Sequence, residues 1–97
     1  MERGGYIYIL TNKNHTVLYT GVTSNLSDRL YEHSTGKYKT SFTSKYNVKD
    51  LVYFEEFLSI EDAINREKQI KAGSRQKKED LINQLNPEWI DLAQTIE

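Results

Sequence analysis

The chain has 97 residues, the length of a single domain, and a formal net charge of −1 at pH 7. It contains no cysteine, which excludes disulfide bonds and cysteine-ligated metal clusters. The N-terminal apolar stretch is too short for a signal peptide and no apolar run is long enough to cross a membrane, so we expect a cytoplasmic protein without a membrane partner. The near-neutral charge argues against tight, nonspecific nucleic-acid binding over the whole surface.

The first predicted element is a β-hairpin. Residues 5–10 and 16–22 are rich in β-branched and aromatic side chains and flank a polar turn. Because side chains alternate along a strand, Tyr6 and Tyr8 are expected on one face and the two isoleucines beside them on the other. Two facing strands would then bring Tyr8 and Tyr19 together on one surface. Strand tyrosines are more often packing residues than reactive ones, so this proximity alone assigns no chemistry.

A helix is predicted over residues 24–36, where Ser24 or Asn25 can cap the first turn. Leucines spaced four residues apart mark its inner face. Arg29 and His33 are also four residues apart, so their side chains lie on one face of the helix, offset from the leucine stripe. Taken alone, this pair is typical of a solvated helix face.

The second half of the chain predicts one strand and several helices. In chain order these are a polar loop or short helix, a strand and three helices, over residues 37–47, 48–58, 59–73, 75–86 and 87–94. Ser59 and Asp62 have the spacing of a capping box, and Pro87 suits the first turn of the last helix. The order β-β-α-β-α-α-α predicts an α+β fold in which helices flank a small three-stranded sheet. The third strand lies either beside the hairpin or in its middle, and the pattern does not decide between these positions.

Several further side chains are assigned to the core or to the surface. The inner faces of the two longer helices are expected to hold Ile60, Ala63, Ile64, Ile70, Leu81, Ile82 and Leu85. The tyrosines interpreted as packing residues are Tyr31, Tyr38, Tyr46 and Tyr53, although Tyr38 lies in a basic loop and could stack on a base. His15 lies in the hairpin turn and is expected to be exposed. Glu67, taken alone, is best explained as an i,i+4 ion-pair partner of Lys71.

An ordered set of short motifs resembles a known family. The set consists of "YIY" at residues 6–8, "YTG" at residues 19–21, Arg29, His33 and Glu67. These residues at these spacings resemble the GIY-YIG endonuclease superfamily, and in particular its small stand-alone bacterial members. The resemblance extends from Gly5 to about Leu92. It implies a three-stranded antiparallel sheet flanked by helices, forming a single domain over residues 1–97.

The resemblance also implies metal-dependent hydrolysis of DNA phosphodiester bonds. The residues that match the family's catalytic positions are Tyr8, Tyr19, Arg29, His33 and Glu67. Glu67 matches the metal-binding glutamate, and the implied cofactor is a divalent cation, Mg²⁺ or Mn²⁺. Arg29 would bind two phosphate oxygens through its planar guanidinium. One of the two tyrosines would be the general base, and His33 would be a proton shuttle or a phosphate donor.

DNA is the expected partner, bound through a local basic patch. Residues 66–78 have six basic side chains and one acidic side chain. Gly21 matches the motif glycine, which leaves room for the DNA backbone to approach. The candidate phosphate contacts are Lys37, Lys39, Lys45, Lys68, Lys71, Arg75, Lys77 and Lys78.

Several departures from the family pattern leave a second hypothesis open. Tyr6 takes the place of the first motif glycine, Thr20 replaces the usual aliphatic residue, and Val22 stands where repair-type members have a lysine. The late asparagine found in several members has only a loose counterpart in Asn86. No appended DNA-binding domain is visible, so a protein partner could supply target recognition, for instance through the acidic segment 79–97. The alternative is a non-catalytic nucleic-acid-binding or protein-interaction module on the same fold.

Overall fold

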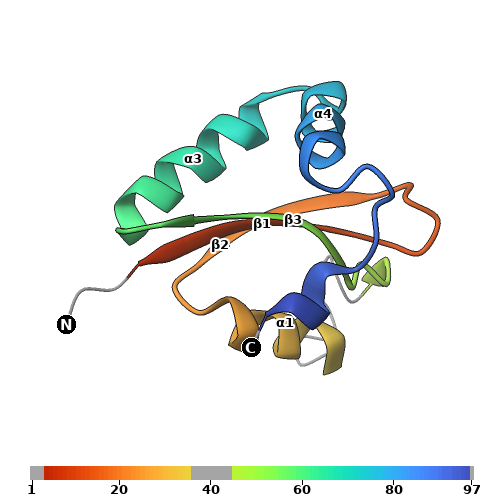
Figure 1. Cartoon of the computed structure of the whole chain (residues 1–97), viewed down its shortest axis with the longest axis horizontal. Helices are drawn as coiled ribbons and strands as arrows, with labels where there is room; N and C mark the ends of the chain where they lie inside the picture. Colours follow the sequence, from red (N-terminus) through yellow and green to blue (C-terminus); the bar gives the residue numbers. More distant parts are fainter. Residues whose placement is uncertain (1–3, 36–44, 97) are drawn as a thin grey trace.

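A computed structural model gives the structure of residues 4–35 and 45–96. The strands and helices are β1 (Gly5–Thr11), β2 (Leu18–Thr23), α1 (Leu26–Thr35), β3 (Asp50–Phe57), α3 (Ile60–Ala72), α4 (Arg75–Leu85) and the 3-10 helix η1 (Leu92–Thr95) (Figure 1). The strands form one antiparallel sheet in the order β2-β1-β3. The predicted α+β fold is therefore confirmed, and the third strand lies beside the hairpin, with β1 in the centre. Within these described ranges, no helix is long and apolar enough to span a membrane.

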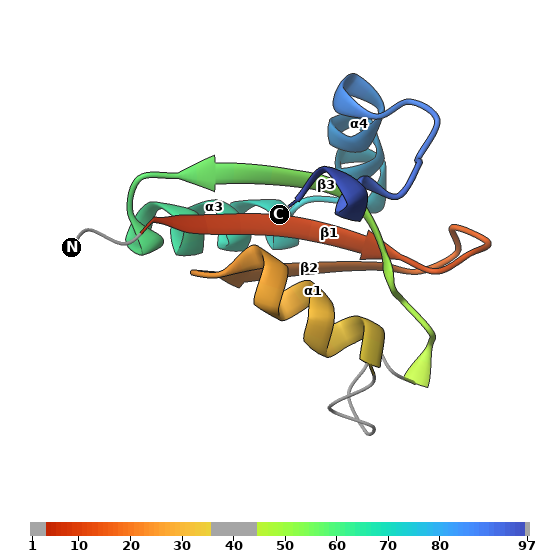
Figure 2. The same cartoon turned by 60° about the horizontal axis from the view of Figure 1, so that its bottom comes forward.

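Helices cover both faces of the sheet. In Figure 1, α3 and α4 lie above the strands, whereas α1 and η1 lie below them. Figure 2 shows the sheet from the α1 side, with β1 between its two neighbours. Ile7 and Ile9 are fully buried in the cluster that includes residues of α3 and α4, whereas Tyr8 and Leu10 are buried in the cluster that includes Leu26 of α1. The predicted alternation of side chains along the first strand is confirmed.

The β1–β2 turn is held by the side chain of Asn12. Its Oδ1 atom accepts hydrogen bonds from the backbone N–H groups of Thr16 and Val17, at 2.9 and 3.0 Å. The buried Thr11 hydroxyl donates to the carbonyl oxygen of Val17 at 2.8 Å. These bonds fix the length of the hairpin loop and hence the register of the two strands.

Each of the longer helices begins after a polar side chain that caps it. Asn25 caps α1, because its Oδ1 atom accepts a hydrogen bond from the N–H of Asp28 at 3.0 Å. Ser59 caps α3 by accepting from the N–H of Asp62 at 3.1 Å, and α4 begins in the same way after Ser74. An N-cap of this kind satisfies one of the backbone donors left open at a helix start.

The predicted inner faces of α3 and α4 are right except near the end of α4. Five of the predicted residues are buried in, or packed against, the hydrophobic cluster around Ile7 and Ile9. They are Ile60, Ala63, Ile70, Leu81 and Ile82. Ile64 is partly buried. Leu85 is 55% exposed, because it is the last residue of α4 and the chain then turns back towards β3.

The predictions for the further tyrosines are only partly right. Tyr53 is buried as predicted, but Tyr31 and Tyr46 are 70% and 45% exposed. Tyr31 lies on the outer side of α1, where the sheet cannot cover it. Tyr38 and most of the segment predicted as a loop or short helix, 37–47, lie outside the described residues.

The last predicted helix starts later than predicted. Pro87 opens a turn instead of a helix, and the N–H of Trp89 donates to the carbonyl oxygen of Asn86 at 2.9 Å. Trp89 has a φ of 56°. This left-handed conformation is incompatible with a right-handed helix, so no helix can run through Trp89. The helix η1 begins only after Asp91, whose carboxylate caps it by accepting from the N–H of Ala93 at 3.0 Å.

Candidate active site

The two motif tyrosines lie side by side on the α1 face of the sheet. In the β1–β2 register, Tyr8 lies opposite Gly21 and Leu10 lies opposite Tyr19, so the tyrosines are diagonal neighbours. Their ring centroids are 6.3 Å apart. Tyr8 is 1% exposed, whereas Tyr19 is only partly buried. The predicted proximity of the two phenols is confirmed.

Gly21 makes room for the ring of Tyr8. A β-carbon on Gly21 would lie 2.4 Å from both Cζ and the hydroxyl oxygen of Tyr8, far inside van der Waals contact. The sequence led us to expect the DNA backbone at this glycine. In the structure, the Tyr8 ring occupies the space that a side chain at position 21 would fill, so the ring requires a glycine there.

We expect Gly21→Ala to lower the free energy of unfolding by about 1–3 kcal/mol, because the new methyl group overlaps the Tyr8 ring in a packed core. A drop in Tm of about 4–8 °C per kcal/mol would report this loss in thermal unfolding. Gly73→Ala is the matched control, since its β-carbon would meet no atom closer than 3.4 Å and its φ is −82°. Equal Tm values for the Gly21→Ala protein and the wild type would contradict the packing assigned to Tyr8.

Helix α1 brings His33 to the two tyrosines. The Nε2 atom of His33 is 3.3 Å from the hydroxyl oxygen of Tyr8, within hydrogen-bonding distance. The imidazole centroid is 6.0 Å from the Tyr8 ring and 5.8 Å from the Tyr19 ring. Burial lowers the pKa of His33, and the positive charge of Arg29 lowers it further. Glu32 opposes this shift, but the net lowering favours the neutral imidazole, whose unprotonated nitrogen can accept a proton.

The ionisation of Tyr8 depends on residues from three elements. Burial, the largest cause, raises the pKa of Tyr8 above its ordinary value, and Tyr19 and Glu67 raise it further. Arg29 lowers this pKa by its charge and by hydrogen bonding, as expected for a guanidinium beside a phenol, but it does not offset the burial. The same interactions place Arg29 of α1 and Glu67 of α3 within electrostatic reach of one hydroxyl group.

Glu67 also forms an ion pair with a lysine of its own helix. Its Oε2 atom is 2.6 Å from Nζ of Lys71, one helical turn later. The Glu67 side chain is 13% exposed and that of Lys71 is 53% exposed. The i,i+4 pair predicted from the spacing is thus confirmed, and the same carboxylate influences Tyr8.

In the described part of the chain, two carboxylates act on this cluster: Glu67 acts on Tyr8, and Glu32, 3.4 Å from Arg29, acts on His33. Among residues 4–35 and 45–96, no three His, Asp or Glu side chains lie close enough together to hold a metal ion. One carboxylate is sufficient for Mg²⁺, which keeps several water ligands and takes oxygens from a substrate phosphate. The Glu67 carboxylate fits this requirement, because it is largely buried and the ammonium group that contacts it belongs to an exposed side chain.

Comparison with known proteins decides the family. A model of the GIY-YIG catalytic domain matches residues 4–80. The chain belongs to the GIY-YIG family. Members of this family are generally endonucleases that use divalent metals, so the protein has a nuclease-like fold.

The GIY-YIG relatives are proteins that consist of little more than this domain. A UPF0213 protein of Syntrophus aciditrophicus is 45% identical over 83 residues, which are 86% of this chain and 93% of that protein. A UPF0213 protein of Staphylococcus haemolyticus is 39% identical over 79 residues, 81% of this chain and 94% of that protein. The solution NMR structure of the UPF0213 protein BH0048 from Bacillus halodurans is 32% identical, covers 89% of both chains and has a TM-score of 0.57. None of these names assigns a reaction.

Two of the lysines predicted to contact DNA line a groove with Tyr19, one of the two GIY-YIG tyrosines. This groove of about 350 Å³ we call the β2 groove, and its lining residues are Leu18, Tyr19, Thr20, Lys71 and Lys78. Lys77 lines a different groove between α3 and α4, and Lys45 and Lys68 are exposed. Lys37 and Lys39 lie outside the described residues.

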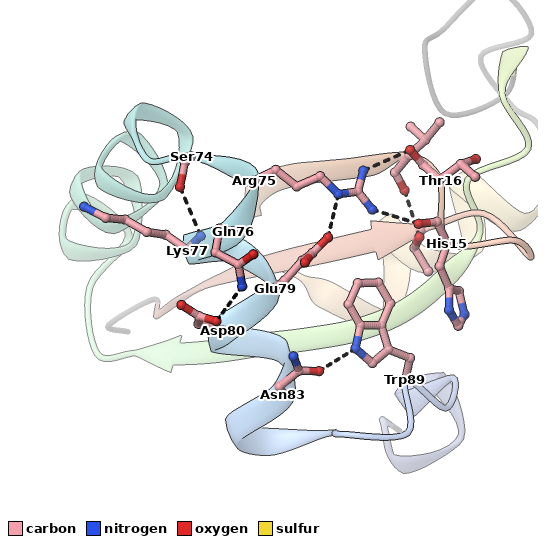
Figure 3. A network of polar contacts seen from close by, with 12 residues as sticks. His15, Thr16, Ser74, Arg75, Gln76, Lys77, Glu79, Asp80, Asn83 and Trp89 are labelled. Carbon is pink, nitrogen blue, oxygen red and sulfur yellow. Dashed lines mark hydrogen bonds and ion pairs between the residues drawn. The ribbon is translucent and has the colours of Figure 1, made fainter.

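Arg75, another predicted phosphate contact, holds the β1–β2 turn. Its guanidinium donates to the carbonyl oxygens of His15 and Thr16, at 2.7 and 2.9 Å, and to the carboxylate of Glu79 at 2.7 Å (Figure 3). The exposed His15 ring lies 4.9 Å from the ring of Trp89. These contacts join α4 and the segment after it to the hairpin, and they engage one donor on each of the three guanidinium nitrogens of Arg75.

Asn86, the loose counterpart of the late family asparagine, has a structural role. Its Nδ2 atom donates to the carbonyl oxygens of Val52 and Ile90, at 3.2 and 2.8 Å. Its Oδ1 atom accepts from the N–H of Ile90 at 3.1 Å. The buried amide therefore ties the chain after α4 to strand β3.

Thr20 has a feature that the sequence does not reveal. Its side chain is buried in β2, and within the described part of the chain its Oγ1 is the buried side-chain polar atom that lacks a hydrogen-bond partner. A buried hydroxyl without a partner costs about 1–3 kcal/mol. In the sequence, the only signal is that a hydroxyl replaces an aliphatic side chain at the centre of the second GIY-YIG motif.

Proposed function

We propose that the protein is a metal-dependent endonuclease that hydrolyses phosphodiester bonds of DNA. The observation that supports this most strongly is the meeting of different chemical groups at the Tyr8 hydroxyl. These groups belong to Tyr19, Arg29, His33 and Glu67. Phosphodiester hydrolysis needs a proton acceptor for the attacking water and positive charge for the phosphate. The cluster offers candidates for both, together with a carboxylate for Mg²⁺ or Mn²⁺.

Arg29 is the phosphate-binding residue in this proposal. Its planar guanidinium can donate two parallel hydrogen bonds to two phosphate oxygens, which a lysine cannot do. Glu67 would hold the divalent cation through its carboxylate. When bound, such a cation stabilises negative charge on the phosphate and lowers the pKa of a bound water.

Tyr8 and Tyr19 remain the two candidates for the general base, and their environments differ. Tyr8 is buried and its pKa is raised, so it can accept a proton only if its own proton moves to a neighbour. The neutral imidazole of His33, 3.3 Å away, is placed to take that proton. Tyr19 is more exposed and lines the β2 groove, where a substrate can reach it directly.

A non-catalytic nucleic-acid-binding or protein-interaction module is the second candidate. Two observations favour it: the Glu67 carboxylate is paired with Lys71, and Val22 stands where repair-type members have a lysine. Such a module would bind DNA or a protein partner without breaking a phosphodiester bond. In the nuclease proposal, a protein partner could still supply target recognition.

A nicking assay on plain, branched and damaged duplex DNA separates these candidates. Product that forms with Mg²⁺ or Mn²⁺ and stops when EDTA is added would support the endonuclease. Binding of these DNAs with no cleavage under any of the conditions would favour the module.

We expect Arg29→Lys to reduce the cleavage rate by on the order of 10- to 100-fold, because lysine keeps the charge but loses the bidentate contact. Single-turnover cleavage of one DNA substrate would measure the effect. Arg75→Lys is the matched control, since Arg75 holds the β1–β2 turn and its replacement should change stability without slowing cleavage by the folded protein. Equal rates for Arg29→Lys and wild type would show that a point charge is sufficient at this position.

A further inference from the structure

The β2 groove adjoins the candidate active site and is lined by groups that bind phosphate oxygens. Tyr19 belongs to both, and the side chains of Lys71 and Lys78 also line the groove. Thr20 also lines the groove, and its buried hydroxyl has no hydrogen-bond partner within the described part of the chain. A 120° rotation about χ1 would move this hydroxyl to another staggered position, from which it would donate a hydrogen bond to an oxyanion in the groove. An anion is the ligand class that suits this combination.

Lys71 links the groove to the carboxylate of Glu67. Its Nζ atom is 2.6 Å from Oε2 of Glu67, while 53% of the lysine side chain remains exposed. A divalent cation on the same carboxylate would lie within a few ångströms of this ammonium group, and the two positive charges would repel each other strongly. Lys71 and a metal ion therefore compete for Glu67.

We infer that Lys71 is an exchangeable cation that neutralises Glu67 until a divalent metal ion binds, and that its displaced ammonium group then binds a backbone phosphate of DNA in the β2 groove. This inference rests on the proposed function, because it takes Glu67 as the metal ligand. The long, flexible side chain of lysine allows such an exchange without movement of α3. Lys78 lines the same groove, and its Nζ atom donates to the carbonyl oxygen of Gly73 at 3.0 Å.

The exchange makes metal binding and DNA binding cooperative. Metal binding releases a phosphate-binding group into the groove, and a phosphate in the groove draws Lys71 away from the metal ligand. By thermodynamic linkage, each ligand must then increase the affinity for the other by the same factor. Without DNA, the Lys71–Glu67 pair weakens metal binding and so restrains the metal-loaded state.

The first test measures Mn²⁺ binding in the absence of DNA, by calorimetry or by the electron paramagnetic resonance of free Mn²⁺. Lys71→Gln should bind Mn²⁺ about threefold or more tightly than wild type, because it removes the competing ion pair. Lys68→Gln is the matched control, since it changes the net charge equally at an exposed position of the same helix, and it should stay near wild type. Glu67→Gln should lose the binding.

The Mn²⁺ results test the metal assignment of Glu67 and the exchange of Lys71 separately. If Glu67→Gln loses Mn²⁺ while Lys71→Gln binds no more tightly than Lys68→Gln, the exchange is wrong and the metal assignment stands. If Glu67→Gln binds Mn²⁺ as wild type does, or if no variant binds it, the metal assignment fails and the inference fails with it.

The second test measures the affinity for a short duplex DNA in EDTA and in Ca²⁺. Ca²⁺ should increase the DNA affinity of wild type relative to EDTA. For Lys71→Gln, this ratio of the two affinities should be lower by a factor of about three or more. Thr20→Val, which keeps the side-chain shape, should weaken DNA binding while raising Tm. Inorganic phosphate at the same ionic strength should not reproduce the enhancement if the ligand is a DNA backbone. An equal enhancement in wild type and Lys71→Gln would overturn the exchange.

Discussion

Glu67→Gln is expected to reduce Mg²⁺-dependent cleavage by on the order of 10³-fold or more, because the substitution keeps the size of the side chain and removes the charge that would hold the metal ion. Glu67 is the carboxylate whose charge is identified as raising the pKa of Tyr8. The single-turnover rate at saturating Mg²⁺ measures the loss. Circular dichroism and Tm should show that the variant remains folded.

Glu79→Gln is the matched control for this prediction. Glu79 is also the partner of a basic residue four positions away in a helix, at 2.7 Å from Arg75, but it belongs to the structural contacts of α4. Its replacement should leave the cleavage rate of the folded protein unchanged. Cleavage by Glu67→Gln at the wild-type rate would show that Glu67 is not the metal ligand.

Removing the hydroxyl of Tyr8 or Tyr19 is expected to have the next largest effect. Phenylalanine keeps the ring and the strand propensity, so each variant should change stability by less than about 1.5 kcal/mol. The variant that lacks the general base should cleave on the order of 10²-fold or more slowly. Measuring single-turnover rates for Tyr8→Phe and Tyr19→Phe identifies which phenol is the base.

Tyr6→Phe and His33→Gln complete this comparison. The Tyr6 hydroxyl donates to Glu56 at 3.4 Å on the surface, so its loss should not affect the rate. If Tyr8 is the base and passes its proton to His33, the Tyr8→Phe/His33→Gln double variant should be little slower than the slower single variant, because the two groups act as a unit. Rates close to wild type for all three phenylalanine variants would rule out a tyrosine base.

Local rules account for the parts of the fold and site that the sequence predicts. Strand alternation and one hairpin register suffice to place Tyr8 beside Tyr19. Capping residues mark the starts of the helices, and the i,i+4 spacing predicts the Glu67–Lys71 pair. Each of these features depends on residues close in sequence or on a single strand pairing.

Features that depend on distant segments are the ones the sequence could not reveal. The sequence does not show that Arg75 holds the β1–β2 turn, because the carbonyl oxygens that its guanidinium contacts are 59 and 60 residues away in sequence. Asn86 is buried because Val52 of β3 accepts its amide. The raised pKa of Tyr8 depends on burial under α1, which opposes the effect of Arg29. Helix-end exposure at Leu85 likewise depends on where the chain turns.

The central claim is that this cluster is a nuclease active site, and the most direct test is metal-dependent DNA cleavage by wild type beside Glu67→Gln. Both proteins should be purified identically, so that any contaminating nuclease is common to both. We predict cleavage by wild type in Mg²⁺ or Mn²⁺, none in EDTA, and a loss on the order of 10³-fold for Glu67→Gln. Equal cleavage by the two proteins, or no cleavage by folded wild type of plain, branched or damaged DNA with either metal, would contradict the claim.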